Sequence, residues 1–322
     1  MLKFKKLFLS LLTVSTFIVC TSTASQPLKG GWLWKISGNG LSQPSYLFGT
    51  YHGTYDILYG YVDSIPGFRQ AFNTCSQYVG EVVTPEGLES ITSELNIKMP
   101  KDTTYANLLN EKDYHFLDSI VHQNLHVSLN QVFITPNYLS LILSKLKQRE
   151  ELAKSGYSKI EIDSITSQVM DNTLEIKAKE KGYVLVGLET TPEQINLLTL
   201  GNDLKKQAAA LIAGLQEDNE YSSIWALGKT LPKVYRAQNI KYLIDFETKT
   251  DSLYQVSAKL KAERKQFQEV LLDHRNINWI NKLPEIIKDK STFIAVGVRH
   301  LPGKKGLIAL LLEKGYRVEA VE

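Results

Sequence analysis

Cysteine is scarce in this chain of 322 residues, where only Cys20 and Cys75 occur. An excess of one charge is also missing: 37 Lys and Arg residues stand against 34 Asp and Glu residues, and the three lysines among residues 1–24 make up the whole difference. A neutral body lacks the concentrated positive field that non-specific nucleic-acid binding requires. We therefore expect no nucleic-acid partner.

Two common signatures of catalysis and ligand binding are missing as well. No serine stands in a Gly-x-Ser-x-Gly elbow, and no glycine-rich loop matches a phosphate cradle. The sequence thus excludes a serine hydrolase of that type and a nucleotide-binding protein. Cys75 shares the core spacing of a predicted helix with Ala71 and Phe72 and has no obvious histidine partner in the local sequence. We expect it to be a buried thiol and not a nucleophile.

A long apolar run occurs only at the start of the chain. Residues 7–20 follow the basic segment of residues 1–6 and precede small residues, an order typical of an export signal. The run is short for a bilayer span, which takes roughly 20 apolar residues. We expect cleavage between Ala24 and Ser25, which removes residues 1–24, leaves no stable membrane span and yields a periplasmic or secreted protein.

Two alternatives to this cleavage remain open. The segment could stay as an uncleaved anchor, or Cys20 could carry a lipid, although the bulky Val19 before it argues against lipid attachment. After cleavage Cys75 would be the only cysteine, so no intramolecular disulfide could form. The rest of the sequence has neither an internal repeat nor a low-complexity linker, and residues 25–322 are expected to form one domain.

Strand-rich ends are expected to enclose a helical middle section. The predicted strands are residues 32–37, 45–50, 78–83, 183–186, 292–296 and 317–321. The first two, joined through Gly38-Asn39-Gly40, read as an N-terminal β-hairpin. Because helical segments separate the later strands, right-handed crossovers predict a largely parallel, mixed sheet with helices on both faces. The expected fold class is α/β.

The helical middle is expected to cover most of residues 101–178 and 204–290. Within it, the polar segment 258–269 is interpreted as a solvated helix face. Another helix is expected to start at residues 191–194, with Thr191 as its N-cap, a proline at the first helical position and Gln194 closing a capping box.

Chemically capable side chains stand near the ends of four of the predicted strands. His52 and His300 each end a Gly-x-x-His tetrapeptide, and Glu81 and Glu189 stand near the ends of two other strands. Ligands of α/β sheets gather outside the carboxyl ends of the strands. Two imidazoles meeting there would form a partial site for a divalent transition metal, and either carboxylate could ligate, hold a metal-bound water or act as general base. Spacing alone leaves open the alternative that the glycines only turn the chain and the histidines are structural.

A second group of histidines was weighed as a metal site. Asp118, His122 and His126 stand four residues apart, with His115 nearby, so one helix would stack them on one face. The His-x-x-x-His spacing is that of a zinc protease helix, but Gln123 stands where such a helix carries glutamate. Apolar residues occupy the opposite face. We therefore expect these histidines on a solvated surface.

Several motifs recur in an order and spacing that point to one family. They are residues 46–52, the Glu81 strand, residues 186–190 with Glu193-Gln194, Arg275-Asn276 with Trp279, and residues 296–303 with Gly306-Leu307. In this combination the chain resembles the TraB/PrgY/GumN family, which is related to the Tiki metalloproteases. The Tiki-like relatives imply a metal-dependent peptidase that uses both Gly-x-x-His motifs and a glutamate, which map onto His52, His300 and Glu81.

The same resemblance draws attention to two arginines. It places Arg275 among the recurring residues of the family. Its guanidinium could bind a substrate carboxylate, steady Glu81 or Glu189 through a bidentate contact, or form a structural salt bridge. Arg299 stands where many relatives have a small residue, which could alter access to the site.

The leading hypothesis is an exported metal-dependent hydrolase, with a peptide or another small molecule as its substrate. A manganese, cobalt or zinc ion at His52 and His300 would activate water for attack on an amide, with Glu81 as base and with Glu189 and Arg275 as further catalytic candidates. The alternative is a non-catalytic periplasmic binding protein that holds a peptide, a saccharide or a metal in the same pocket.

Overall fold

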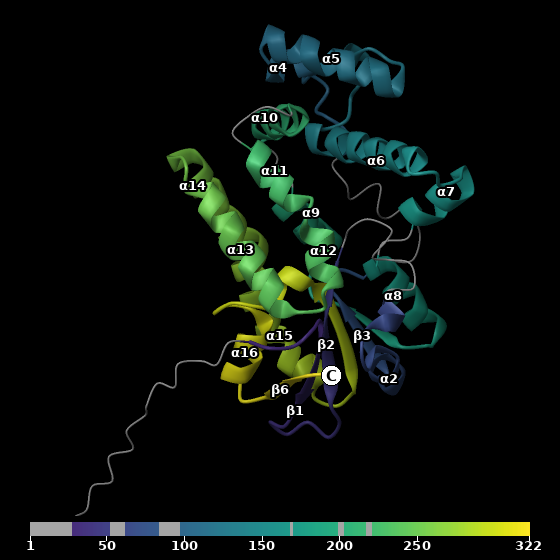
Figure 1. Ribbon diagram of the computed structural model, residues 1–322, viewed down its shortest axis with the longest axis vertical. Helices are drawn as coiled ribbons and strands as arrows, with labels where there is room; N and C mark the ends of the chain where they lie inside the picture. Colours follow the sequence, from purple (N-terminus) through teal and green to yellow (C-terminus); the bar gives the residue numbers. More distant parts are fainter. Residues whose placement is uncertain (1–27, 52–61, 84–96, 168–169, 199–202, 217–220) are drawn as a thin grey trace, which may run out of the picture.

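A mixed six-stranded sheet forms the base of the molecule (Figure 1). The computed structural model describes residues 28–51, 62–83, 97–167, 170–198, 203–216 and 221–322. In these ranges the strands are β1 (Leu33–Ser37), β2 (Ser45–Thr50), β3 (Gln77–Gly80), β4 (Val184–Gly187), β5 (Thr292–Gly297) and β6 (Arg317–Ala320). They lie in the order β4-β3-β5-β2-β1-β6. The predicted α/β fold class is confirmed.

Four neighbouring strands, β4, β3, β5 and β2, run parallel to one another. β1 pairs antiparallel with β2, as the predicted N-terminal hairpin requires, and also antiparallel with β6. In the parallel ladders Thr50 of β2 lies opposite Gly297 of β5, and Gly80 of β3 lies opposite Gly187 of β4. This register brings the carboxyl ends of the four strands to one edge of the sheet.

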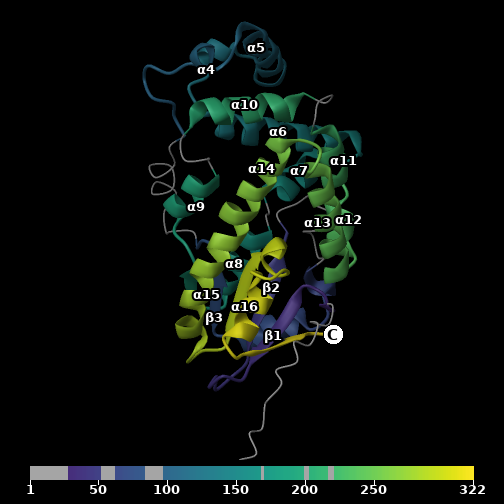
Figure 2. The ribbon, with the colours of Figure 1, turned by 90° about the vertical axis from the view of Figure 1, so that its left-hand side faces the viewer.

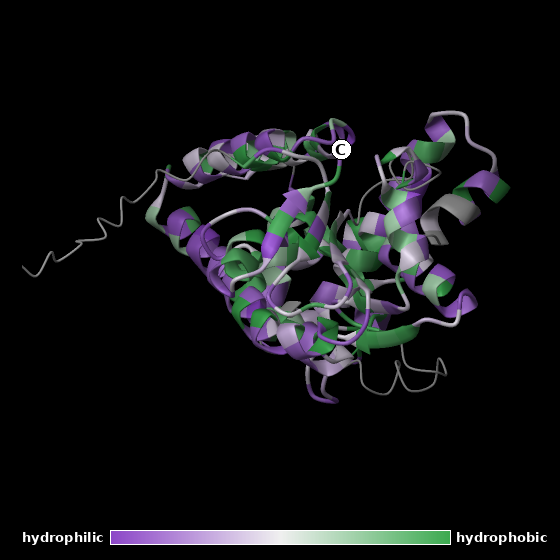
Figure 3. Ribbon diagram, turned by 90° about the horizontal axis from the view of Figure 1, so that it is seen from below, coloured by the Kyte–Doolittle hydropathy of each residue, from purple (hydrophilic) through white to green (hydrophobic). Residues whose placement is uncertain are grey.

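Helices cover both faces of the sheet, as predicted. α2 (Phe68–Thr74) and α8 (Met170–Glu180) lie on one face, and α15 (His274–Ile287) and α16 (Leu307–Glu313) lie on the other (Figures 1 and 2). Hydrophobic and hydrophilic residues both occur along the same helices, as in amphipathic helices (Figure 3).

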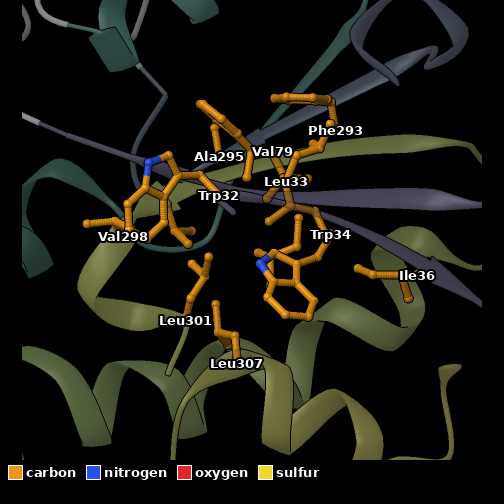
Figure 4. Packing of buried hydrophobic residues seen from close by; sticks show 14 of the residues in the cluster. Trp32, Leu33, Trp34, Ile36, Val79, Phe293, Ala295, Val298, Leu301 and Leu307 are labelled. Atoms are coloured by element: carbon orange, nitrogen blue, oxygen red, sulfur yellow. The ribbon is translucent and has the colours of Figure 1, made fainter. Parts of the chain in front are cut away.

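The main hydrophobic core surrounds the sheet, and Figure 4 shows part of it. Trp32, which precedes β1, is fully buried, and its indole nitrogen donates to the carbonyl oxygen of Tyr235 at 2.7 Å. The two rings stack with centroids 5.0 Å apart. The Tyr235 hydroxyl in turn donates to the carbonyl oxygen of Gly49 at 2.7 Å. These contacts tie α12 (Leu231–Arg236) to the carboxyl end of β2.

The helical middle section extends beyond the carboxyl ends of the parallel strands (Figure 2). Its helices are α4 (Tyr105–Leu108), α5 (Glu111–Leu125), α6 (Pro136–Lys154), α7 (Lys159–Ser167), α9 (Thr191–Leu198), α10 (Leu204–Leu215), α11 (Ser222–Gly228), α12, α13 (Ile240–Tyr254), α14 (Ala258–Phe267) and the π-helix η4 (Gln268–Asp273). Short 3-10 turns are η1 (Val62–Ser64), η2 (Leu129–Gln131) and η5 (Val298–His300).

A second, smaller core packs α4, α5, α6 and α10 together. Its fully buried members include Leu117, Val121 and Leu139. Among the described helices, none is long and apolar enough to cross a membrane.

Candidate functional site

Glu81 and Glu189 lie side by side at the carboxyl edge of the sheet, as the sequence predicts. The pairing of β3 with β4 continues past the strand ends, because the amide of Leu188 donates to Gly80 at 3.0 Å and the amide of Glu189 donates to Glu81 at 2.9 Å. A Cβ atom on Gly187 would lie 3.0 Å from the carbonyl oxygen of Glu189. Glycine at this position therefore permits the turn that places Glu189.

Arg275 of α15 joins the two carboxylates. Its Nε donates to Glu189 Oε2 at 3.1 Å, and its Nη2 donates to Glu189 Oε1 and to Glu81 Oε2, both at 2.5 Å. Its Nη1 donates to the carbonyl oxygen of Leu271 at 3.3 Å and lies 3.2 Å from Nε2 of His300. The five N–H donors of a guanidinium thus each have an acceptor. Arg275 steadies the carboxylates and has no donor left for a substrate.

Arg275 stays positively charged although it is buried. Its side chain is only 8% exposed. Burial by itself lowers the pKa of the guanidinium, but the hydrogen bonds that it donates to Glu189 and the negative charges of both glutamates outweigh burial, so that the pKa lies above its ordinary value. The ring of Trp279 lies 4.6 Å from the guanidinium carbon and adds a cation–π contact.

His300 is held in one tautomer by Asn276. The Asn276 amide nitrogen donates to the carbonyl oxygens of His300, at 3.3 Å, and Lys305, at 2.8 Å, so its Oδ1 must be an acceptor. Oδ1 lies 2.7 Å from Nδ1 of His300, which must then carry the proton. The Nε2 atom faces a donor, Nη1 of Arg275, and presents its lone pair. This is the neutral form in which histidine ligates metals.

Trp279 covers the imidazole of His300. The two rings lie with centroids 4.5 Å apart, and Trp279 is 1% exposed while His300 is 3% exposed. Arg275, Asn276 and Trp279 all come from the first turns of α15, which follows the π-helix η4. One buried helix face therefore contacts the carboxylates, the imidazole and its backbone.

Gln194 is a member of the site that the sequence analysis misassigned. We expected Thr191 as N-cap and Gln194 closing the capping box, but the box is one residue earlier: the amide of Thr190 donates to Glu193 at 2.7 Å and the amide of Glu193 donates to Thr190 Oγ1 at 3.3 Å. Gln194 Nε2 is thereby free to donate to Glu189 Oε1 at 3.1 Å and to Glu81 Oε2 at 3.3 Å. The charged Glu193 is the stronger acceptor for the cap.

Glu81 receives donors on both of its oxygens. Oε2 accepts from Arg275 and Gln194, and Oε1 accepts the amide of Gly297 at 2.7 Å. Oε1 also lies 3.7 Å from Nε2 of His300. Two carboxylates and one guanidinium give these three described side chains a formal charge of −1, the sign that attracts a cation.

The chemistry of these donors fits a divalent metal ion in part. The Nε2 lone pair of His300 and the Oε1 atom of Glu81 are donor types that manganese, cobalt and zinc accept. Across the described ranges, no group of three or more His, Cys, Asp or Glu side chains is arranged to hold a metal. His52, the second predicted ligand, lies outside the described residues.

The strand that leads to His52 ends where the sequence predicts. Gly49 and Thr50 at the end of β2 lie opposite Val296 and Gly297 of β5. A Cβ atom on Gly49 would lie 2.9 Å from a side-chain atom of Val298, so glycine is required for this close approach. The two Gly-x-x-His motifs therefore begin on adjacent strands, while the position of His52 itself stays a prediction.

The histidines of α5 stand apart from this site. His115, His122 and His126 are all exposed, as expected for a solvated surface. His126 is the C-cap of the helix and has a left-handed φ of 59°. It therefore does not continue the helical face on which Asp118 and His122 were expected to lie with it. Asp118 accepts the amide of Leu129 at 2.6 Å and has a structural role.

The functional residues that the sequence analysis did not assign are Gln194 and Asn276. A signal for Asn276 was present, because Asn276 and Ile280 share the spacing of a buried helix face with Arg275 and Trp279. A polar residue on a face that is otherwise apolar indicates a specific partner. The sequence did not reveal that this partner is His300.

One known family accounts for nearly the whole described chain. The sequence profile of the TraB/PrgY/gumN family matches residues 32–320. The match runs from the start of the hairpin to the end of β6 and includes Glu81, Glu189, Arg275 and His300. No curated protein and no solved structure matches the chain significantly.

Proposed function

The chain belongs to the TraB/PrgY/gumN family, and from that membership and the geometry of the cluster we propose that it is an exported metal-dependent hydrolase that cleaves amide bonds in peptides. One observation carries the proposal. The Nε2 atom of His300 lies 3.7 Å from Glu81 Oε1. His300 follows β5, the neighbour of the strand β2 that leads to His52. The relation of the family to the Tiki metalloproteases supports the same chemistry.

His52 and His300 are the proposed metal ligands, with Glu81 close by. A manganese, cobalt or zinc ion bound there would polarise the scissile carbonyl and lower the pKa of a water molecule. The negative charge left on the described cluster supports the binding of a cation. Asn276 keeps the proton on Nδ1 of His300 and so places the lone pair on Nε2, where a metal would take the place of Nη1 of Arg275.

Glu81 is the proposed general base. Its Oε1 atom lies 3.7 Å from Nε2 of His300 and accepts the amide of Gly297 at 2.7 Å, which places it beside the proposed metal ligand. Arg275 and Gln194 hold its other oxygen and fix the direction of the carboxylate. Arg275 is thus a positioning residue, and Glu189 holds Arg275 in place through a bidentate contact.

A non-catalytic periplasmic binding protein is the second candidate, and the saturation of Arg275 favours it. Every donor of the guanidinium is already paired, as in a rigid structural network. Such a network would hold a metal, a peptide or a saccharide without turning it over.

The test measures bound metal and peptide hydrolysis in the same set of variants. Protein purified without chelator is analysed for metal and then assayed on an unbiased peptide mixture with added manganese, cobalt or zinc. His300→Ala and His52→Ala should each lose most of the bound metal. Glu81→Gln should keep the metal, while turnover falls by roughly 10²- to 10⁴-fold, the effect expected on losing a general base.

His122→Ala is the matched control, because His122 is an exposed histidine of α5 outside the cluster. It should retain metal and activity. Since His300 is buried, the melting temperature of each variant is measured in parallel. If Glu189→Gln abolishes turnover and Glu81→Gln does not, the two carboxylates have exchanged roles. Ligand binding without any turnover in wild-type protein would favour the binding protein and refute the hydrolase.

A further inference from the structure

A cavity of about 770 Å³ lies next to the candidate site. Arg299, which lines it, directly precedes His300 in the 3-10 turn η5, and Tyr51, which also lines it, directly follows β2. The side chains of these two residues of η5 diverge: His300 contacts Asn276 of α15, whereas Arg299 contacts Glu247 of α13. The cavity and the carboxylate cluster therefore lie on either side of one short turn.

Aromatic rings form much of the cavity wall. Those that line it are Tyr51, Phe246, Tyr254 and Phe267. The guanidinium carbon of Arg299 lies 5.3 Å from the ring centroid of Phe267 and 5.9 Å from that of Phe246. Both rings are within the range of a cation–π contact and hold the Arg299 guanidinium at the cavity wall.

One edge of the Arg299 guanidinium is engaged by protein, and the other is not. Its Nε donates to Glu247 Oε1 at 2.6 Å. The second oxygen of Glu247 accepts from Nη2 of Arg264 at 2.8 Å, and Asp251 holds Nε of Arg264 at 2.6 Å. Within the described part of the chain, no acceptor pairs with Nη1 or Nη2 of Arg299. The side chain is 28% exposed, so this edge can reach a ligand.

The described lining of the cavity has more positive than negative side chains. Lys229, Arg264 and Arg299 line it, against Glu151 as the one carboxylate among its described lining residues. Glu247 and Asp251 contact the arginines but do not line the cavity. Because Glu247 and Asp251 offset the charges of Arg264 and Arg299, an anionic group would be attracted by Lys229 and by the edge of the Arg299 guanidinium that no described acceptor occupies.

We propose that this cavity binds a carboxylate of the substrate through the Nη1–Nη2 edge of Arg299, with the aromatic wall holding the apolar group next to it. The planar edge of a guanidinium matches the two oxygens of a carboxylate in a bidentate contact. The proposal rests on the proposed function and names its substrate class: peptides that carry a free carboxylate beside a hydrophobic side chain. The carboxylate is that of the peptide terminus or of an acidic side chain.

The test is a binding measurement that needs no turnover. Isothermal titration calorimetry on the full exported protein, in EDTA and again with zinc, compares N-acetyl-alanyl-phenylalanine with its C-terminal amide. A third probe, the amide of N-acetyl-aspartyl-phenylalanine, carries a side-chain carboxylate only. A charge-assisted bidentate contact should make at least one acid bind about 10- to 100-fold more tightly than the neutral amide. Whichever acid is favoured identifies the source of the carboxylate.

Arg299→Gln should remove this preference, and Arg299→Lys should keep part of it, because lysine retains the charge but not the planar edge. Arg69→Gln is the matched control: Arg69 also donates from Nε to a carboxylate, that of Asp63, but is exposed and does not line the cavity. It should keep the full preference. Circular dichroism checks the fold of each variant.

Equal binding of acids and amide by wild-type protein would overturn the proposal, as would a preference that survives in Arg299→Gln. The proposed function fails separately. A carboxylate preference without hydrolysis under any metal leaves the cavity assignment intact and refutes the hydrolase. Hydrolysis of acids and amides at equal rates, in wild type and in Arg299→Gln, would leave the hydrolase intact and refute the cavity assignment.

Discussion

Replacing Arg275 with methionine should destabilise the protein strongly and in a pH-dependent way. Methionine keeps the unbranched apolar stem but removes the charge that joins Glu81 and Glu189. Arg275, Glu81 and Glu189 have side chains only 8%, 10% and 7% exposed, so solvent screens their interaction little. Removing one partner of a buried ion pair costs about 3–5 kcal/mol, because the remaining charge is left uncompensated. Here two carboxylates would be left.

The same reasoning sets the direction of the pH dependence. In the variant, a proton taken up by one carboxylate relieves the repulsion between the two, and the folded protein takes it up more readily than the unfolded chain does. When the folded state binds more protons, stability falls as pH rises. The deficit relative to wild type should therefore be largest at pH 7–8 and should shrink toward pH 5. Arg275 of the wild type stays charged throughout this range.

Urea unfolding followed by tryptophan fluorescence measures the effect, in EDTA so that bound metal does not contribute. A loss of this size should lower the melting temperature by about 5–8 °C in a chain of this length. Arg69→Met is the control, because its ion pair with Asp63 is exposed and its loss should change little. The reasoning is refuted if Arg275→Met unfolds within about 1 kcal/mol of wild type at pH 7, or if its deficit does not change between pH 7 and pH 5.

Two further predictions concern buried groups. Burial raises the pKa of the Cys75 thiol to about 11, despite a hydrogen bond from Ser291. The neutral thiol therefore stabilises the fold fully below about pH 8.5, the region of the unfolded pKa. This contribution to stability is lost as the pH rises from there toward 11. The stability advantage of wild type over Cys75→Ala should narrow over that range in urea unfolding, and a constant difference would contradict it. Asn276→Leu removes the acceptor for Nδ1 of His300 and should weaken metal binding by about 10- to 100-fold in a chelator competition. Asn276→Asp keeps the acceptor and should lose less metal affinity. Equal losses of affinity in both variants would contradict the role of Asn276.

Local sequence was sufficient to predict the sheet and the meeting of the two glutamates. Runs of β-prone residues interrupted by helical segments determine parallel pairing, and parallel pairing brings strand ends to one edge. Glu81 and Glu189 each follow a glycine-ended strand and meet as expected. The predicted strand at residues 78–83 proved to end at Gly80, since strand boundaries depend on the partner strand as well as on propensity.

Other features depended on how separate elements pack. The polar segment 258–269 was interpreted as a solvated helix face, yet Arg264 is 8% exposed and pairs with Glu247 and Asp251 of α13. Helical periodicity shows which residues share a face, but it does not show which neighbouring helix covers that face.

The sequence by itself determined the fold class, the strand ends at which Glu81, Glu189 and His300 stand, and the burial of Cys75, because each follows from the composition or periodicity of a short stretch. Only the tertiary structure decided that Arg275 is saturated by five acceptors, that Asn276 sets the tautomer of His300, and that Gln194 serves the carboxylates and not a helix cap. Each of these contacts joins residues from different elements, and hydrogen-bond partners at that range are set by the docking of α15 and α9 on the edge of the sheet. The spacing of residues along the chain does not reveal how these helices dock on the sheet.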